Sequence, residues 1–421
     1  MRILFLTENF PPETNAAATR VYERACYWVK WGHDVTVVTC APNFPYGRLF
    51  DGYQNSWRQT ELMDGVRVVR VKTYISPNQG TVKRTLDFMS FMFSSVIVSL
   101  FEKRPDVVVS TSPQFFAAIG GWLLGGLRRV PFIFELGDLW PASIVAVGAM
   151  RDGFLIRFLE RLELFLYLNA SAVISLTHAF KANLVSRGIS TGKIAVVLNG
   201  VDLWRYGPRE PDPNLKKELS GSGRFVVGYV GTHGMAHGLN NVLKAAELLR
   251  EREDITFLLV GAGSERAGLI ANAEVYGLAN VTFMPPQPKG MVPAVWSQCQ
   301  VALVHLRNLS AFKDVIPSKM FEAMGMGLPI ILSIPEGEAS AILKKSGAGV
   351  HIPPDDPVAL ANAITQLADD QELCRSLGSN SLRAAPQHSR ERQAAHMLSV
   401  LEAVKAGGGG CVDQISAPDI N

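Results

Sequence analysis

The 421-residue sequence has few cysteines and almost no net charge. No C-x-x-C pair occurs among Cys26, Cys40, Cys299, Cys374 and Cys411, so neither a disulfide framework nor a thiolate metal site is indicated. The net charge of +3 argues against a nucleic-acid partner, because such proteins usually carry a strongly basic domain. We therefore expect a protein of a reducing cytoplasm that does not bind nucleic acid.

Long apolar runs and familiar cofactor signatures are also missing. The apolar run before Glu8 is only Ile3–Thr7, too short for a signal peptide. The fourteen uncharged residues 88–101 are fewer than a membrane-spanning helix needs. Neither G-x-G-x-x-G nor D-x-D occurs, so a dinucleotide cofactor and a catalytic divalent metal are not indicated. We expect no cofactor and no metal.

Short runs rich in β-branched residues alternate with helical patterns along the whole chain. The first set of predicted strands is Ile3–Thr7, Val35–Thr39, Val66–Val71, Val107–Ser110, Phe132–Glu135, Ala172–Ser175 and Ile194–Val197. The second set is Phe225–Val230, Thr256–Val260, Val281–Phe283, Gln300–Val304, Pro329–Leu332 and Gly349–Ile352. Such alternation predicts parallel sheets covered by helices on both faces. Since one core stops growing at roughly 250–300 residues, we expect two doubly wound α/β domains.

A proline-rich stretch between the two sets marks the predicted domain boundary. We assign residues 1–198 to the first domain, 199–223 to a linker and 224–388 to the second domain. The last predicted helix, 389–405, can pack back on the first domain. Residues 406–421 contain four consecutive glycines, 407–410, and are expected to form a disordered tail.

Ligands of doubly wound domains bind at the carboxyl ends of the strands, so residues that follow strands are the candidates. The loop after the first strand leads through Asn15 and Thr19 into a helix start of small residues, where a ligand can approach backbone N–H groups. An ordinary turn explains this loop equally well. After the fifth strand, Asp138 can accept a hydrogen bond from a sugar hydroxyl while Trp140 packs on the sugar. The alternative for Asp138 is a helix cap.

The first loop of the second domain contains Gly231, Thr232, His233 and His237. Its glycines allow a close backbone approach, and the histidines can meet phosphate oxygens at the start of a helix. A second glycine-containing loop, 261–266, has Arg where the third glycine of a dinucleotide fingerprint belongs, so we interpret it as a turn.

The strongest local pattern is the segment from Asp314 to Glu322, with Lys319 between the two acids. One carboxylate can take ribose hydroxyls, the other can take the transferred sugar, and Lys319 can neutralise a pyrophosphate. A surface pair of Lys319 and Glu322 is the alternative. Downstream, Gly337, Glu338 and Ala339 precede a helix whose free N–H groups can also hold phosphate.

The order of these motifs resembles the retaining glycosyltransferases of family 4, which have the GT-B fold of two Rossmann-like domains facing a cleft. The resemblance covers nearly all of residues 1–405 and rests on the series Phe10-Pro11-Pro12, Asp138-Leu139-Trp140-Pro141, Asn199-Gly200-Val201-Asp202, Gly231-Thr232-His233-Gly234, Pro317-Ser318-Lys319, Gly325-x-Gly327-x-Pro329 and Gly337-Glu338-Ala339. The segments 40–48 and 135–141 are similar to the WbuB-like branch, which transfers N-acetyl-L-fucosamine in bacterial surface-polysaccharide assembly.

The resemblance implies residue roles. Glu322 binds the ribose, and Asp314 occupies the first acidic position of the family's E-x7-E motif, which contacts the donor sugar. Lys319 supplies the cation that the family usually places near the first glycine loop. Gly137 stands where the family typically has a basic residue.

The implied reaction moves a sugar, with retention, from a nucleotide diphosphate donor such as UDP to a polyprenyl-diphosphate-linked saccharide in O-antigen, capsule or exopolysaccharide assembly. The apolar region 88–101, flanked by basic residues, and the dense apolar pattern 153–168 are interpreted mainly as helices covering the sheet. The alternative is peripheral contact with the inner membrane. Two other functions fit the architecture, a sugar-nucleotide epimerase and a non-catalytic nucleotide-sugar-binding protein.

Overall fold

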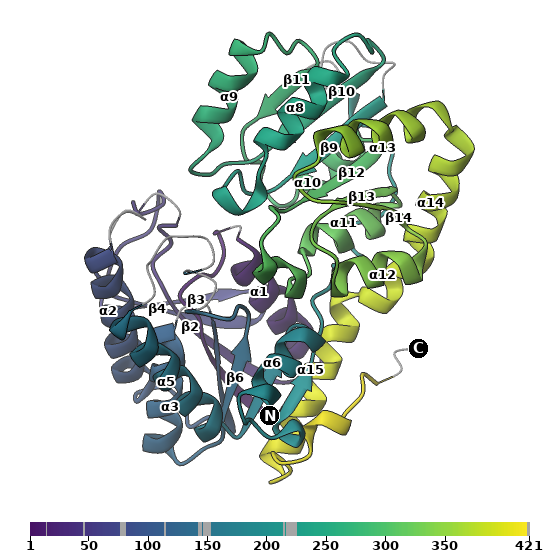
Figure 1. Ribbon diagram of the computed structural model, residues 1–421. Coiled ribbons are helices and arrows are strands. Elements are labelled where there is room, and N and C mark those ends of the chain that lie inside the picture. Colours follow the sequence, from purple (N-terminus) through teal and green to yellow (C-terminus); the bar gives the residue numbers. More distant parts are fainter. Residues whose placement is uncertain are drawn as a thin grey trace. The chain divides into compact units, whose positions relative to one another are not determined.

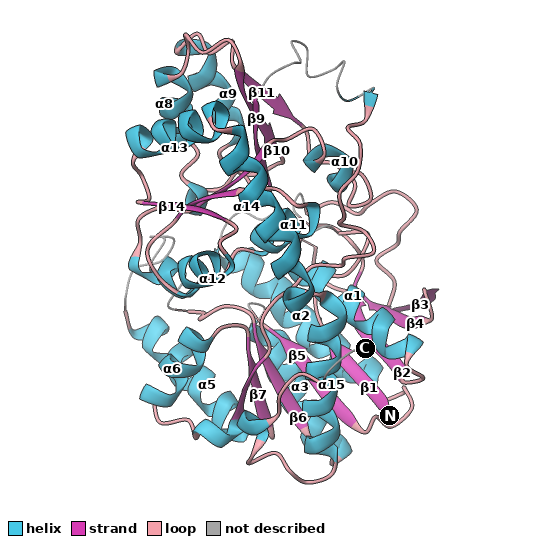
Figure 2. Ribbon diagram, turned by 90° about the vertical axis from the view of Figure 1, so that its right-hand side faces the viewer, coloured by secondary structure: helices cyan, strands magenta, loops and turns pink. Residues whose placement is uncertain are grey.

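The structure is a computed structural model that describes residues 1–13, 15–44, 47–75, 81–112, 115–141, 145, 153–213, 215 and 225–418. The chain divides into two compact units (Figure 1). The first unit is Met1–Asn199 with Arg390–Asn421, and the second is Gly200–Ser389. Each unit contains one sheet with helices packed against it (Figure 2).

The first unit contains an eight-stranded sheet in the order β3-β4-β2-β1-β5-β6-β7-β8. Its strands are β1 (Arg2–Leu6), β2 (Asp34–Cys40), β3 (Arg58–Met63), β4 (Val66–Val71), β5 (Val107–Thr111), β6 (Phe132–Leu136), β7 (Ala172–Ser175) and β8 (Ile194–Val196). Its helices are α1 (Ala16–Lys30), α2 (Thr81–Ser99), α3 (Phe115–Arg128), α5 (Phe154–Asn169), α6 (His178–Ser186), η1 (Thr191–Lys193), α15 (Arg390–Lys405) and η5 (Val412–Gln414). The strands predicted for this unit are confirmed to within one residue at either end.

The second unit contains a six-stranded parallel sheet in the order β11-β10-β9-β12-β13-β14. Its strands are β9 (Phe225–Val230), β10 (Ile255–Val260), β11 (Val281–Met284), β12 (Val301–His305), β13 (Ile330–Ser333) and β14 (Gly349–Ile352). Its helices are η2 (Met235–His237), α8 (Asn240–Leu248), α9 (Arg266–Val275), α10 (Val292–Trp296), η3 (Ser310–Asp314), α11 (Ser318–Met326), α12 (Glu338–Ser346), α13 (Pro357–Asp369), α14 (Gln371–Ala384) and η4 (Ala385–His388).

One strand departs from the predicted parallel pattern. The sequence reading contained no strand between residues 40 and 65, but β3 lies there and pairs antiparallel with β4. Its side chains are alternately exposed and half-buried, as expected for an edge strand with one face toward solvent. It is therefore too polar to stand out beside inner strands such as β5, all of whose residues are buried.

The strand orders place a switch point in each sheet. The chain leaves β1 toward β2 and later returns to its other side with β5; in the second sheet, β9 lies in the same way between β10 and β12. Ligands of doubly wound sheets bind at the carboxyl ends of the strands at such points. The loops after β1 and β9 are thus the candidate ligand-binding loops.

The C-terminal helix α15 belongs to the first unit, where it packs on α1. Arg390 pairs with Glu23 at 2.9 Å and donates to the Asn199 amide oxygen at 2.7 Å. The Trp28 indole donates to the Ala394 carbonyl at 2.9 Å. These contacts are buried, so α15 is part of the first unit's core.

The prediction of a disordered tail is wrong for residues 406–418. Val412 is fully buried in the core of the first unit, and η5 contacts β8 and η1. Glycine permits this path, because a Cβ on Gly409 would lie 2.6 Å from the Ser171 carbonyl oxygen, and one on Gly192 would lie 2.3 Å from that of Gly410. Residues 419–421 lie outside the described part of the chain.

The start of the predicted linker is integrated into the second unit. Val201 forms a bridge with Ser389, and the backbone of Tyr206 lies against Gly325, where a Cβ would lie 3.2 Å from the Tyr206 carbonyl oxygen. Residues 214 and 216–224 of this stretch lie outside the described residues.

Candidate active site

Two glycine loops meet at the carboxyl edge of the second sheet. Gly231 follows β9 with φ +152°, and Gly261 follows the adjacent β10 with φ +150°. A Cβ on Gly261 would lie 1.8 Å from the Gly231 carbonyl oxygen, and one on Gly263 would lie 2.3 Å from the His233 carbonyl oxygen. Only glycine allows this packing, so the loop at 261–266 is the support on which the first glycine loop rests.

Lys319, from the second residue of α11, reaches the first glycine loop. Its Nζ lies 3.7 Å from the centroid of the Tyr229 ring, and a Cβ on Gly231 would lie 2.7 Å from Nζ. Nζ is shielded from solvent and has no hydrogen-bond partner among the described residues. Burial lowers the pKa of Lys319 to about 7, against the opposing charge of Glu322. The alternative of a surface ion pair between Lys319 and Glu322 does not fit this placement.

The two histidines of the loop differ in exposure. His233 is fully buried, and its ring packs against Tyr229 and Phe283. His237 is half-buried, and its Nδ1 is enclosed without a hydrogen-bond partner among the described atoms. The buried ring of His233 therefore supports the loop from the side of the core. Thr232 is exposed, and His237 is partly accessible.

Both imidazoles are neutral near pH 7. Burial, with smaller effects of the cations Arg266 and Lys319, lowers the pKa of His233 to about 4. Burial and Lys319 lower the pKa of His237 to about 3. The neutral tautomer of a third histidine holds this loop in place, because His305 Nδ1 donates to the His237 carbonyl oxygen at 2.7 Å. The sequence analysis did not single out Tyr229, Arg266 or His305.

Asp314 and Glu322 lie on different elements. Asp314 ends η3, residues 315–317 are extended, and Glu322 is on α11, which begins after Pro317. The two acids are therefore not two turns apart on one helix, since proline ends the preceding structure and starts the next. Both side chains are half-buried, and the Trp296 indole donates to Glu322 Oε2 at 3.4 Å.

The Gly337 loop lies against the segment that carries Asp314. A Cβ on Gly337 would lie 1.9 Å from the Lys313 carbonyl oxygen, so a side chain is excluded here. The Gly337 N–H donates to Ser340 Oγ at 2.9 Å, while Glu338 and Ala339 form the first turn of α12. The positive end of α12 thus adjoins the carboxylate segment of the same unit.

In the first unit, the predicted residues follow β1 and β6. Asn15 caps α1, because its Oδ1 accepts from the Ala18 N–H at 2.9 Å, and its Nδ2 donates to Asn9 Oδ1 at 2.8 Å. Thr19 lies one turn into α1 and is buried. Asp138 is half-buried after β6, and the Trp140 ring stacks on Phe115 with centroids 5.0 Å apart. Trp140 is therefore already in contact with an aromatic ring.

Two arginines that the sequence analysis did not select lie next to this site. Arg20 and Arg24 both pair with Glu135 Oε1, at 3.1 and 2.6 Å, and all three side chains are buried. Burial raises the pKa of Glu135, but the two guanidinium groups and hydrogen bonds outweigh it and bring the pKa to about 2. A Cβ on Gly137 would lie 3.2 Å from Arg20 Nη2. Arg20 thus fills the space beside the glycine.

Three buried carboxyl groups near the carboxyl end of β1 were also missed. Burial and the neighbouring acids Asp87 and Glu13 raise the pKa of Glu8 well above its usual range. Burial raises the pKa of Asp87 to about 7, partly opposed by Arg84. Glu13 accepts from the Asn43 and Phe44 N–H groups at 2.8 Å, and its other oxygen has no partner among the described atoms. No pattern in the sequence separates these acids from surface acids.

The two units therefore offer different chemistry. The second collects a cation, neutral imidazoles and helix starts, which suit an anion. The first collects carboxyl groups and an asparagine, which suit hydroxyl groups. Among the described residues, no group of three or more His, Cys, Asp or Glu is arranged to hold a metal ion.

Several known proteins are similar to this chain in sequence or in fold. WcaI of Escherichia coli K12, named for colanic acid biosynthesis, is 25% identical over 377 residues, 87% of this chain and 92% of its own. WbjE of Pseudomonas aeruginosa, named as a glycosyltransferase, is 26% identical over 67% of this chain and 70% of its own. The crystal structure of Anabaena HepE with UDP and glucose has a TM-score of 0.71, with 20% identity, and covers 95% of this chain and 99% of its own.

Family models cover both units. The model described as "Glycosyl transferase 4-like domain" matches residues 15–200, and the model described as "Glycosyl transferases group 1" matches residues 212–383. The two doubly wound sheets agree with the GT-B architecture expected from the resemblance. The chain belongs to the GT-B glycosyltransferases of family 4.

Proposed function

We propose that this glycosyltransferase moves a sugar from a UDP-activated donor to a polyprenyl-diphosphate-linked saccharide during assembly of a bacterial surface polysaccharide, with retention at the anomeric carbon. The observation that carries the donor half is the Lys319 ammonium, enclosed against Gly231 without a hydrogen-bond partner among the described residues. A buried cation without hydrogen bonds is costly, and a diphosphate would supply them.

The proposed chemistry needs no side-chain nucleophile. As the glycosyl–phosphate bond breaks, the sugar becomes oxocarbenium-like and the electron pair stays on the UDP β-phosphate. Lys319 and the starts of α11 and α12 stabilise that negative charge. The acceptor hydroxyl attacks from the same face, and its proton passes to the departing phosphate. This route uses no metal ion.

The donor contacts follow from the second unit. Glu322 binds the ribose hydroxyls, Asp314 contacts the sugar, and the N–H groups around Gly231, Thr232 and Gly337 meet the phosphates, with Glu338 and Ala339 at the helix start and His237 beside them. The UDP bound by HepE supports the choice of base. For the sugar, N-acetyl-L-fucosamine is the candidate from the family resemblance.

The acceptor contacts follow from the first unit. Asp138 accepts a hydrogen bond from the acceptor sugar, and Asn15, Thr19 and Trp140 line the same edge of the sheet. The relation to WcaI, named for colanic acid biosynthesis, supports an acceptor that belongs to a surface polysaccharide. A polyprenyl-linked acceptor places the enzyme in the cytoplasm, at the inner face of the membrane.

The donor assignment is tested by titrating the purified protein with UDP, GDP, ADP and dTDP. UDP should bind most tightly, and Glu322→Ala should weaken it by at least about tenfold, because a buried hydrogen bond to a charged group is lost. Glu274→Ala, an exposed acid on α9, is the control and should bind as the parent does. Equal binding by Glu322→Ala, or no binding of any diphosphate, would refute the assignment.

Product analysis separates transfer from epimerisation. With UDP-sugar alone, an epimerase converts the donor, whereas the proposed transferase leaves it nearly intact until a lipid-linked acceptor is added. Conversion without acceptor would contradict the proposal.

A further inference from the structure

Three helices of the first unit form one layer on its sheet: α3 contacts both α2 and α5 (Figure 1). Each helix buries one side against the unit, as shown by Phe91 of α2, Leu124 of α3 and Leu166 of α5. Their outward sides are also apolar, which an ordinary covering helix avoids. The layer therefore has a second apolar surface directed away from the core.

The outer residues of the layer, here called the α2/α3/α5 face, are large. They are Leu86, Phe93, Ile97, Leu100 and Phe101 at α2, Leu123 and Leu127 on α3, and Phe154, Leu155, Phe158, Phe165 and Leu168 on α5. Phe154 is 88% exposed and Phe101 77%. By contrast, α1 of the same unit exposes no large apolar side chain, because α15 packs on it. Large exposed apolar side chains gathered on adjoining helices mark an interaction site.

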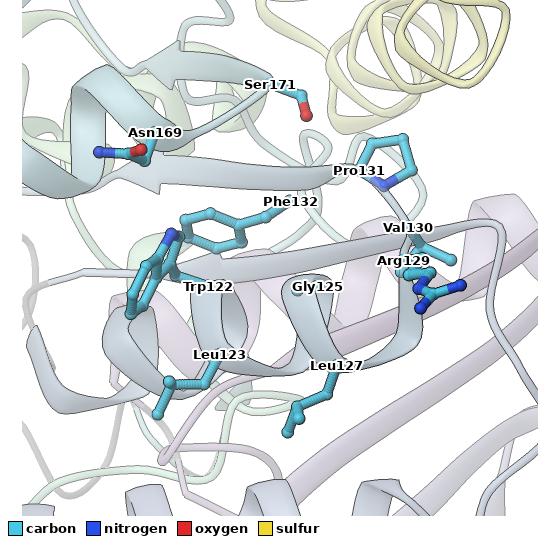
Figure 3. A pocket seen from close by; sticks show the side chains of 11 residues that line it. Trp122, Leu123, Gly125, Leu127, Arg129, Val130, Pro131, Phe132, Asn169 and Ser171 are labelled. Carbon is cyan, nitrogen blue, oxygen red and sulfur yellow. The ribbon is translucent and has the colours of Figure 1, made fainter.

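The face continues into a hollow between the ends of α3 and α5 (Figure 3). Its volume is about 610 Å³, and its walls include Trp122, Leu127 and Phe132. Trp122 also packs edge-on against Phe165, with centroids 5.1 Å apart, and so joins α3 to α5. The hollow is lined mainly by apolar side chains, with Arg129 at its rim.

The exposed charges on and beside the face are basic. On α5 they are Arg157 and Arg161, near the start of α2 they are Lys83 and Arg84, and after α2 they are Lys103 and Arg104. The acids of α5 are less available, because Glu160 is half-buried and Glu163 is buried and paired with Arg187 at 2.7 Å. An apolar surface with a basic rim is complementary to an anionic bilayer and not to a neutral protein partner.

We propose that the α2/α3/α5 face binds the surface of an anionic phospholipid bilayer, with Phe101, Leu127 and Phe154 inserted among the lipids and Arg157 and Arg161 at the headgroups. The proposal rests on the proposed function, because a polyprenyl-linked acceptor lies in a membrane. The contact lies on α5 and on the side of α2 opposite Phe88, which is half-buried beside Phe116. No helix among the described residues is long and apolar enough to cross the bilayer.

The test is cosedimentation of the full chain with vesicles of phosphatidylglycerol and phosphatidylethanolamine in equal parts, against vesicles of phosphatidylcholine. The parent should bind the anionic vesicles preferentially. Phe101→Glu with Phe154→Glu should weaken this binding by at least about tenfold, since both residues lie exposed on the face. Arg157→Gln with Arg161→Gln should weaken it by about 25-fold, from about fivefold per cation.

The controls are Leu62→Glu, an exposed residue of β3 in the same unit, and Val275→Glu on α9. Both should bind vesicles as the parent does. Unchanged vesicle binding in the two face variants would overturn the proposal. A parent dimer that these variants dissociate in sedimentation velocity, without bilayer binding, would overturn it in favour of contact between copies. UDP titration keeps the two proposals apart, because face variants should retain UDP binding even if vesicle binding fails.

Discussion

The two units differ in which of their buried charged groups have partners. In the first unit, Arg20 and Arg24 are neutralised by Glu135, while the acids Glu13 and Asp87 each bury an oxygen that has no hydrogen-bond partner among the described residues. In the second, the Lys319 ammonium nitrogen is buried without a hydrogen-bond partner among the described residues and lies over the Tyr229 ring. Removing one partner of a buried ion pair destabilises the fold, whereas a buried charge without a hydrogen-bond partner is available to a ligand.

Under the proposed function, this difference corresponds to the two halves of the reaction. A diphosphate brings the negative charge that Lys319 lacks, and a sugar brings hydroxyl groups that carboxyl oxygens accept. The cations of the first unit are less available to a phosphate, because separating them from Glu135 would leave a buried carboxylate alone.

The largest effect is expected from breaking the buried ion pairs of the first unit. Glu135→Gln should lower the free energy of unfolding by about 3–5 kcal/mol, because two buried guanidinium groups lose their counter-charge. Urea unfolding followed by tryptophan fluorescence measures it, and Trp28 lies 5.6 Å from Arg24. Asp254→Asn, which removes an exposed partner of Arg252, is the control and should cost less than about 1 kcal/mol. Equal stability of the two variants would break the comparison.

Lys319→Ala tests the proposed phosphate site of the second unit. UDP affinity should fall by about 100-fold, since charge-assisted hydrogen bonds to the diphosphate are lost, while thermal stability should stay level or rise. Calorimetric titration measures the affinity. Lys313→Ala, an exposed lysine of the neighbouring η3, is the control. A fall in stability without a fall in affinity would show that Lys319 is structural.

Replacing Gly337 tests whether the close packing of its loop positions the proposed donor site. Gly337→Ala places a Cβ 1.9 Å from the Lys313 carbonyl oxygen, so the backbone must move, at a cost of about 1–3 kcal/mol. We expect UDP affinity to fall by several-fold as α12 shifts. Gly268→Ala on α9 has open space at the same distance and is the control. Identical affinities would remove the Gly337 loop from the donor site.

The sharpest pH test uses Lys319, whose pKa of about 7 leaves it partly neutral at physiological pH. The ammonium form binds the diphosphate, so UDP affinity should fall as the pH rises from 6 to 8, by up to about tenfold per unit above 7. Lys319→Arg remains charged throughout and corrects for the titration of UDP itself. Parallel pH profiles of the two proteins would contradict a titrating lysine.

The smallest effect concerns Asp87 in the first unit. Burial raises its pKa to about 7, so its neutral form is favoured in the folded state. The stabilisation is complete below the unfolded pKa and is lost as the pH rises through 7. Asp87→Asn should therefore flatten the decline of unfolding free energy between about pH 4 and 7. Glu61→Gln, an acid already paired with Arg70, is the control and should preserve the decline.

The sequence predicts much of the fold because inner strands are recognisable. Strands such as Ala172–Ser175 and Phe225–Val230 match their predicted limits, since the strands of a parallel sheet are short, mostly apolar runs rich in β-branched and aromatic residues. The polar edge strand β3 lacks that signal. The buried tail residue Val412 was missed because local composition does not reveal a tertiary contact with β8.

The candidate site was predictable where one loop carries several signals. Lys319 follows Pro317 on a helix start, which local spacing reveals. The contact of Lys319 with Tyr229, and the pairing of Arg20 with Glu135, join residues 90 and 115 positions apart. Such pairs form only when strands distant in sequence become neighbours, so no spacing rule finds them. The face on α5 was interpreted as a core helix because helical periodicity does not show which of two apolar sides is covered.

The route of the chain through its two units has a consequence for synthesis. The second unit is continuous, so all of its residues have been synthesised before α15. The core of the first unit is complete only after Trp28 contacts Ala394 and Val412 is buried, and both partners lie late in the chain. A chain that stops at residue 389 should thus yield a second unit able to bind UDP beside a first unit that proteases cut readily. Synthesis of α15 and η5 is therefore the step that completes the first unit.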